Sequence, residues 1–176
     1  LDIKESMLSV LIFTRNSEGL LAQTLSALVP AVVEGLLRRV VVVDRASTDE
    51  TRLVAEGAGC SLYDETDLQS AFDDLRTDWL LLLKPGAILA DGWEDAVRRH
   101  MEMSQSPARF SSPQDLGLMG KLLGAKPSLD NGLLAPVVTI RPLIGDGGVP
   151  GAVLKQLKPI RLPHQILPPE TTKGGA

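Results

Sequence analysis

The sequence predicts a three-layer α/β/α fold, in which a mostly parallel sheet is covered by helices on both faces. Three observations support this fold class. Apolar runs of strand length alternate with segments whose apolar residues have helical spacing. Residues 40–43 are consecutive valines, as expected for a parallel strand that is buried on both faces. Polar or turn-forming residues follow each apolar run, which suits strands joined by right-handed crossovers.

Composition narrows the class of protein. The 176 residues are 44% hydrophobic and carry a formal net charge of -4, which suits one domain, residues 1–176, with a substantial core. The mild acidity argues against nucleic acid as a partner, because phosphate binding needs clustered basic residues. Cys60 is the only cysteine, so no intrachain disulfide can form, and we expect a cytoplasmic location. No apolar run could cross a bilayer and no signal peptide is evident, so we expect at most peripheral membrane contact.

The first strand is expected at residues 7–13, an apolar run that ends in polar residues. Ser17 can cap the helix that follows, in which leucines recur on one face. Pro30 is expected to disturb the end of this helix, because proline lacks the backbone N–H that a helix interior needs.

The second strand, residues 40–43, brings Asp44 to the carboxyl edge of the sheet, where ligands bind in open α/β folds. Asp44 is therefore placed for recognition, although a solvated carboxylate that merely ends a strand is the alternative. Ser47 and Glu50 have capping-box spacing, which predicts a helix from about residue 48.

Two further strands are expected before the middle of the chain. Residues 60–63 suit a short third strand, and Asp67 can cap the next helix. Residues 79–83 form a fourth apolar strand, which is broken by the Lys-Pro-Gly turn at residues 84–86.

The last third of the chain is rich in proline and glycine, which predicts short elements. A helix is expected from residue 91 and an extended piece at residues 107–113. Residues 133–140 are the best strand candidate, with Pro136 at a sheet edge or bulge. Residues 166–176 are expected to be a disordered tail.

Several separated motifs resemble those of the family 2 glycosyltransferases of the GT-A fold. The Thr-Arg-Asn turn at residues 14–16 and the Val-Val-Asp-Arg-Ala-Ser-Thr-Asp segment at residues 42–49 match the ends of the family's first two strands. Residues 77–83 and 91–93 are similar to its fourth strand and following helix start. The resemblance implies that residues 1–100 form a nucleotide-binding half and residues 101–165 a short acceptor-side half.

The resemblance also implies a function. Such enzymes transfer a sugar from a nucleotide diphosphate to an acceptor hydroxyl. Thr14 and Asn16 would shape the pocket for the base and ribose, and Asp44 would accept a hydrogen bond from the base, since an ionised carboxylate is a strong acceptor. Thr14 and Asn16 also suit an ordinary strand end and turn, which is the structural alternative for this pair.

The sequence departs from the family at its metal motif. Where the family ends its fourth strand with Asp-x-Asp, this chain has Lys84, Pro85 and Gly86, without a carboxylate. Because divalent cations need oxygen ligands, we expect no divalent metal and no other cofactor. Lys84 and Arg15 could instead place positive charge near the diphosphate, whereas a solvated turn lysine is the alternative for Lys84.

The family's catalytic base has no clear counterpart. The corresponding region, residues 147–154, lacks a carboxylate, and the nearby acids Asp130 and Asp146 lie in turn-forming sequence where Asp is common. The sequence therefore assigns no catalytic residue.

Two functions follow from these observations: a small glycosyltransferase, or an inactive relative that binds a nucleotide or docks a partner. The C-terminal third contains apolar residues interleaved with Lys and Arg, and these could form a docking edge for a second copy, another protein or a lipid surface. Covering the protein's own core is the simpler role. The apolar residues are Leu154, Leu157, Ile160, Leu162, Ile166 and Leu167.

Overall fold

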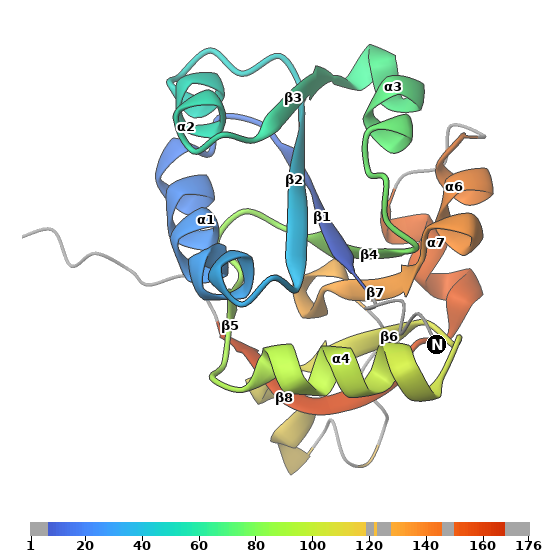
Figure 1. The fold of residues 1–176 in the computed structure, drawn as a ribbon. Coiled ribbons are helices and arrows are strands. Elements are labelled where there is room, and N and C mark those ends of the chain that lie inside the picture. The colour runs from blue at the N-terminus through green and yellow to red at the C-terminus, as the bar shows by residue number, and fades with distance from the viewer. Residues whose placement is uncertain (1–6, 119–121, 123–127, 146–149, 168–176) are drawn as a thin grey trace, which may run out of the picture.

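The computed structural model describes residues 7–118, 122, 128–145 and 150–167, which form one mixed sheet flanked by helices (Figure 1). The sheet has eight strands in the order β3-β2-β1-β4-β7-β6-β8-β5. The strands are β1 (Leu8–Thr14), β2 (Leu37–Asp44), β3 (Ser61–Asp64), β4 (Trp79–Leu83), β5 (Ile88–Leu89), β6 (Ala108–Ser111), β7 (Leu133–Pro136) and β8 (Ile160–Leu167). The helices are α1 (Glu18–Val33), α2 (Thr51–Gly57), α3 (Leu68–Asp73), α4 (Trp93–Met103), α6 (Val137–Gly145) and α7 (Pro150–Leu157). Short 3-10 turns are η1 (Glu65–Asp67), η2 (Pro113–Leu116) and η3 (Leu129–Asn131).

The first four strands are parallel, as the alternating pattern predicts. β1 pairs with β2 on one side and with β4 on the other, and β2 pairs with β3. The last third of the chain adds β7, which is antiparallel to both β4 and β6, and β8, which is parallel to β6. The predicted three-layer, mostly parallel α/β/α architecture is therefore confirmed.

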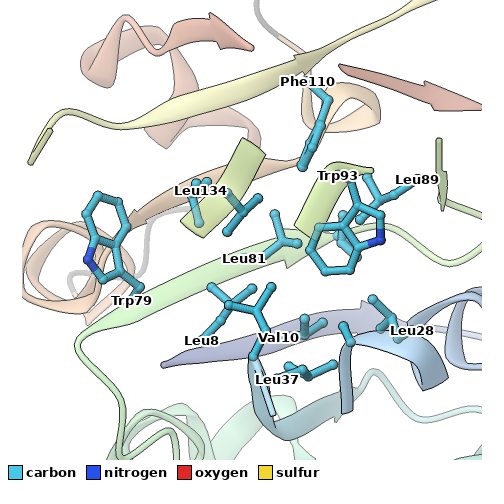
Figure 2. Close-up of a cluster of buried hydrophobic side chains, with 14 of the residues drawn as sticks. Leu8, Val10, Leu28, Leu37, Trp79, Leu81, Leu89, Trp93, Phe110 and Leu134 are labelled. Carbon is cyan, nitrogen blue, oxygen red and sulfur yellow. The ribbon is translucent and has the colours of Figure 1, made fainter. Parts of the chain in front are cut away.

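Each face of the sheet is covered by its own set of helices. Val10 and Ile12 of β1 pack in one cluster with side chains of α1, α2 and α4, whereas Leu11 points to the opposite face and packs with α3, α6 and α7. Figure 2 shows the first of these clusters, in which the two tryptophans lie beside the leucines of β1 and β4. This division follows from the alternation of side chains along a strand.

The capping-box prediction is wrong. α2 begins at Thr51, after an N-cap residue, Glu50, whose side chain makes no capping hydrogen bond. The hydroxyl of Ser47 donates to the carboxylate of Asp44 instead. A buried carboxylate needs hydrogen-bond donors more than an exposed helix end does, so Ser47 serves the strand rather than the helix.

Two other helices begin where the sequence predicts, but without the expected capping hydrogen bonds. Ser17 and Asp67 occupy N-cap positions, but neither side chain makes a capping hydrogen bond. Pro30 lies inside α1, which continues to Val33, so it does not end the helix.

The strand predicted at residues 133–140 is half right. β7 ends at Pro136, which pairs with Trp79 at the start of β4, and α6 begins at the next residue. The N–H of Val137 donates to the backbone carbonyl of Asp78, the residue that precedes β4.

β8 was not expected from the sequence. It includes residues 166 and 167, which belonged to the predicted disordered tail, while residues 168–176 lie outside the described residues. Within the apolar set of the C-terminal third, Leu154, Leu162 and Ile166 are buried in the protein's own core, and Ile160 and Leu167 remain exposed. No helix in the described parts of the chain has the length and apolarity to cross a membrane.

Leu81→Ala should lower the free energy of unfolding by about 2–5 kcal/mol, because it leaves a cavity in the central strand β4. Leu81 is fully buried. Urea denaturation measures the change, and Leu53→Ala is the control, since Leu53 is 63% exposed and its truncation should cost less than about 0.5 kcal/mol. Equal losses in the two variants would contradict the assignment of the core.

Candidate functional site

The carboxyl ends of β2, β1 and β4 lie next to one another at one edge of the sheet. Thr14 pairs with Asp44 at the ends of β1 and β2, and Ile12 pairs with Leu83, the last residue of β4. Because parallel strands end at the same edge, the five residues predicted for nucleotide binding share this edge. They are Thr14, Arg15, Asn16, Asp44 and Lys84.

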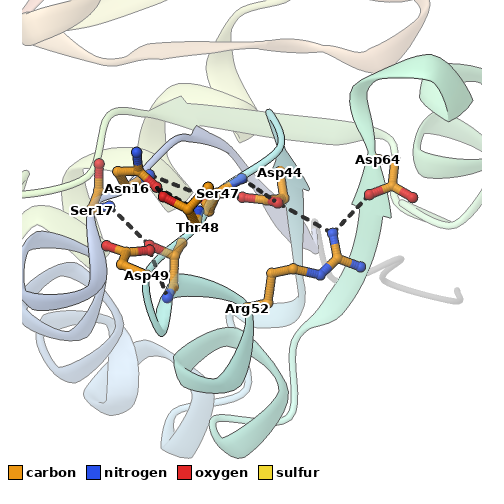
Figure 3. Close-up of polar contacts among 9 residues, drawn as sticks. Asn16, Ser17, Asp44, Ser47, Thr48, Asp49, Arg52 and Asp64 are labelled. Carbon is orange, nitrogen blue, oxygen red and sulfur yellow. Dashed lines mark hydrogen bonds and ion pairs between the residues drawn. The ribbon is translucent and has the colours of Figure 1, made fainter.

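Asp44 is buried, and its carboxylate holds the loop that follows β2 (Figure 3). One oxygen accepts from the N–H of Ser47 at 3.1 Å and from Arg52 at 3.2 Å, and the other accepts from the Ser47 hydroxyl. Arg52 also donates to Asp64 at 2.7 Å, and its hydrogen bonds to Asp64 and Asp44 raise its pKa. The guanidinium thus connects the ends of β2 and β3.

Asn16 connects the loop after β1 to the loop after β2. Its side-chain oxygen accepts from the N–H of Thr48 at 2.7 Å, and its backbone N–H donates to the Ser47 hydroxyl at 2.9 Å. Its φ of 46° is left-handed, a conformation that Asn tolerates better than most residues. Next to it, the N–H of Ser17 donates to Thr51 at 2.8 Å. The two strand ends are therefore side by side, and the protein's own side chains bridge them.

Thr14 and Arg15 differ in exposure. Thr14 is 2% exposed, and its hydroxyl has no hydrogen-bond partner among the described residues. Arg15 is exposed. A buried hydroxyl without a partner is costly, so Thr14 has unused hydrogen-bonding capacity at this edge.

Arg45 is a further charged residue at this edge, and it was not among the residues predicted from the sequence. Its guanidinium lies over the Phe13 ring, 5.1 Å from the centroid, and its Nε is 3.4 Å from Glu65. The sequence feature that could have identified Arg45 is its position directly after Asp44. The Arg45 guanidinium therefore lies against Phe13 and Glu65 at the end of β2.

Lys84 is half exposed and forms an ion pair with Asp130, with 2.6 Å between Nζ and Oδ1. Asp130 belongs to η3 and also accepts from the Ser128 hydroxyl at 2.6 Å. The hydrogen bonds from Lys84 and Ser128 lower the pKa of Asp130. Lys84 is thus paired with a carboxylate, although its side chain remains half exposed. Asp146, the other acid considered as a base, lies outside the described residues.

A buried polar cluster lies next to η3. Asp115, 2% exposed, accepts from Arg109 at 3.0 Å and from the side chain of Asn131 at 3.3 Å. Arg109 and Asn131 are also buried. The sequence signal was an arginine inside the apolar strand at residues 108–111, since buried arginines need a carboxylate partner.

No family model matches the chain, and no curated protein matches it. Solved structures with a similar fold are glycosyltransferases. Glucosyl-3-phosphoglycerate synthase from Mycobacterium tuberculosis, in complex with Mn²⁺, UDP and glucosyl-3-phosphoglycerate, has a TM-score of 0.57 and 15% identity, over 76% of this chain and 57% of that chain. Another structure of this M. tuberculosis synthase has a TM-score of 0.64 and 13% identity, and the match covers 96% of this chain and 73% of that chain. A mannosyltransferase from Pyrobaculum calidifontis, in complex with GDP-Man and Mn²⁺, has a TM-score of 0.66 and 16% identity, over 95% and 58%.

These structures overturn the expectation that no divalent metal takes part. Mn²⁺ accompanies UDP in the synthase and GDP-Man in the mannosyltransferase, and a further synthase structure holds Mg²⁺ with UDP. In the part of this chain that the structure describes, no group of three or more His, Cys, Asp or Glu residues could hold a metal. At the end of β4, residues 84–86 offer no carboxylate, so the residues present there do not fit the usual metal motif.

Ala46→Gly should raise the free energy of unfolding by about 1 kcal/mol, because Ala46 has a left-handed φ of 53° that costs an L-residue energy and glycine adopts freely. Chemical denaturation measures the change. Ala58→Gly is the matched control: its φ is -84°, so the same substitution there should destabilise by about 0.5–1 kcal/mol. Destabilisation at both positions would argue against the left-handed loop.

Asp115 should contribute stability that is lost in acid. Burial disfavours its ionised form, but hydrogen bonds from the N–H of Ser112 and from Arg109 outweigh burial, so the pKa of Asp115 lies below its usual value. The contribution is full above the pKa of an unfolded Asp, about 4, and is lost as the pH falls through the lower folded pKa. The difference in Tm between the wild type and Asp115→Asn should therefore narrow below about pH 4. A constant difference from pH 7 to pH 3 would contradict this.

The chain spans 57% of the length of the first synthase structure, and at these identities the likeness concerns the fold. The chain has a mixed, mostly parallel α/β fold whose close structural matches are GT-A glycosyltransferases.

Proposed function

We propose that the chain binds a nucleoside diphosphate sugar at the shared edge of β2, β1 and β4 and transfers the sugar to an acceptor hydroxyl. The observation that carries the proposal is the pairing of Thr14 with Asp44 at adjacent parallel strand ends. Ligands bind at this edge in open α/β sheets. Glycosyltransferases of similar fold hold UDP or GDP-Man, which supports this ligand class.

Asp44 and Thr14 are the proposed contacts for the nucleoside. One Asp44 oxygen accepts a hydrogen bond from the Ser47 hydroxyl and from no other described residue. A carboxylate oxygen can accept two hydrogen bonds, so this oxygen would accept the second from a ring N–H of the base. The unpaired hydroxyl of Thr14 can bond the base or the ribose. Asn16 would act by fixing the loops, since its side chain is already bonded to Thr48.

Arg15 and Lys84 are the proposed contacts for the diphosphate. Lys84 follows β4, one strand from Thr14 and two from Asp44, so the cation and the base-reading carboxylate lie at opposite ends of the edge. Positive charge there stabilises the diphosphate as it leaves. A divalent cation would add the same kind of charge stabilisation, but the described residues do not supply its ligands, so no step is assigned to it.

A second function is supported by a specific observation: an inactive nucleotide-binding or partner-docking protein. The carboxylate of Asp44 and the amide of Asn16 are already engaged by the loop residues 47 and 48. Asp130, the described acid that was considered as a catalytic base, is paired with Lys84. Binding of UDP-sugars without hydrolysis or transfer would favour this function over the first.

Asp44→Asn should weaken UDP or GDP binding at least about tenfold, because it replaces a charged acceptor by a neutral amide. Calorimetry measures binding in the presence of Mn²⁺, since nucleotide and Mn²⁺ occur together in the similar structures. Asp64→Asn is the matched control, because it removes the other carboxylate partner of Arg52 without touching Asp44.

Asp64→Asn should retain nucleotide affinity within about twofold, since Asp64 is placed outside the nucleoside contacts. Equal losses in the two variants would mean that Asp44 acts only by holding Arg52. Absence of UDP and GDP binding in the wild type would overturn the proposed function.

A further inference from the structure

The ion pair between Lys84 and Asp130 is held in place from both strands that carry it. Lys84 directly follows β4, and Asp130 lies in η3, just before β7, which is antiparallel to β4. Gly132 permits this close approach: its φ is 63°, and a Cβ there would lie 3.1 Å from a methyl group of Leu83. η3 therefore packs directly against the end of β4.

Asp130 is exposed, but neighbouring groups hold its carboxylate in place. The Ser128 hydroxyl donates to its carboxylate at 2.6 Å and accepts from its N–H at 3.2 Å. The next residue, Asn131, is buried and donates to Asp115 and to the carbonyl of Phe110. A chain of contacts thus links the buried polar cluster to Asp130 and through it to the Lys84 ammonium.

We infer that Asp130 is a positioning residue, which holds the Lys84 ammonium where the diphosphate of the ligand lies. This inference rests on the proposed function. Adjacent strands are about 4.8 Å apart, so the end of β4 lies on the order of 10 Å from Asp44 across two strand spacings, which suits the span from a base to its diphosphate. An ammonium that donates one N–H to Asp130 keeps two for phosphate oxygens.

Asp130 has two opposing effects on diphosphate binding: it orders the Lys84 side chain, and its negative charge repels the diphosphate. The lysine side chain is long and flexible, so a fixed partner removes most of the entropy loss that binding would otherwise incur. Asp130 is 68% exposed, so water screens its repulsion of the diphosphate. We therefore expect the loss of Asp130 to weaken diphosphate binding rather than strengthen it.

The test compares UDP with uridine, because the ratio of their affinities isolates the diphosphate contacts. Binding is measured with Mn²⁺ present. Lys84→Ala should reduce the preference for UDP about tenfold, or ~1.4 kcal/mol. Asp130→Asn should reduce it about threefold, and the double variant should lose no more than Lys84→Ala, since Asp130 acts through Lys84.

Arg141 and Asp73 provide the matched control. They form an ion pair of the same 2.6 Å length and similar exposure, between α6 and α3. α3 lies before the amino end of β4 and α6 follows the carboxyl end of the antiparallel β7, so this pair is at the opposite edge of the sheet. Asp73→Asn should leave the preference for UDP unchanged.

An unchanged preference in Asp130→Asn would overturn the inference, as would losses that add up in the double variant. A loss in Asp130→Asn that persists without Lys84 and vanishes without Mn²⁺ would also overturn it, because Asp130 would then act as a metal ligand. These outcomes leave the proposed function standing. Failure of the wild type to bind either UDP or GDP overturns both.

Discussion

The parallel pairing of β1 with β2 determines where every candidate residue lies. Backbone hydrogen bonds hold Thr14 opposite Asp44, and the same strand, β1, pairs on its other side with β4. Because side chains alternate along these strands, a slip of one residue would turn Val41 and Val42 to the wrong faces of the sheet. Burial in two separate apolar clusters therefore fixes the register and, with it, the edge where Asp44 and Lys84 emerge.

Asp44 combines a structural and a proposed binding role. Its carboxylate accepts hydrogen bonds from Ser47 and Arg52, and the same loop is tied to β1 through Asn16. Such bonds fix the position of the carboxylate before any ligand arrives, which lowers the entropy cost of binding. They also mean that a ligand must share an acceptor that is already in use.

The sequence predicted the first half of the fold well and the last third poorly. The strands up to residue 83 are apolar runs with clear ends, so local pattern was sufficient. β8 contains Pro163 and His164, and its pairing with β6, about fifty residues earlier, has no local signal. The capping box failed for the same reason, because a competing bond from Ser47 to Asp44 depends on burial that spacing does not reveal.

The candidate site was predictable in its position but not in its contacts. Strand ends place Thr14, Asn16, Asp44 and Lys84 at one edge. The partner of Lys84 lies forty-six positions further along the chain, and only the antiparallel return of β7 brings the two together. The absence of a carboxylate in the turn after β4 predicted a protein without a divalent metal. Similar structures that contain Mn²⁺ overturn this prediction, which rested on that single turn.

The place of β8 in the sheet has a consequence for synthesis. β8 pairs with β6 on one side and with β5 on the other, although both of these strands precede it by many residues. During synthesis β5 and β6 emerge from the ribosome before residues 160–167, so each has one backbone edge that stays unpaired until β8 is made. Unpaired strand edges favour association with other chains, so the nascent protein is most vulnerable to aggregation in the interval before β8 inserts.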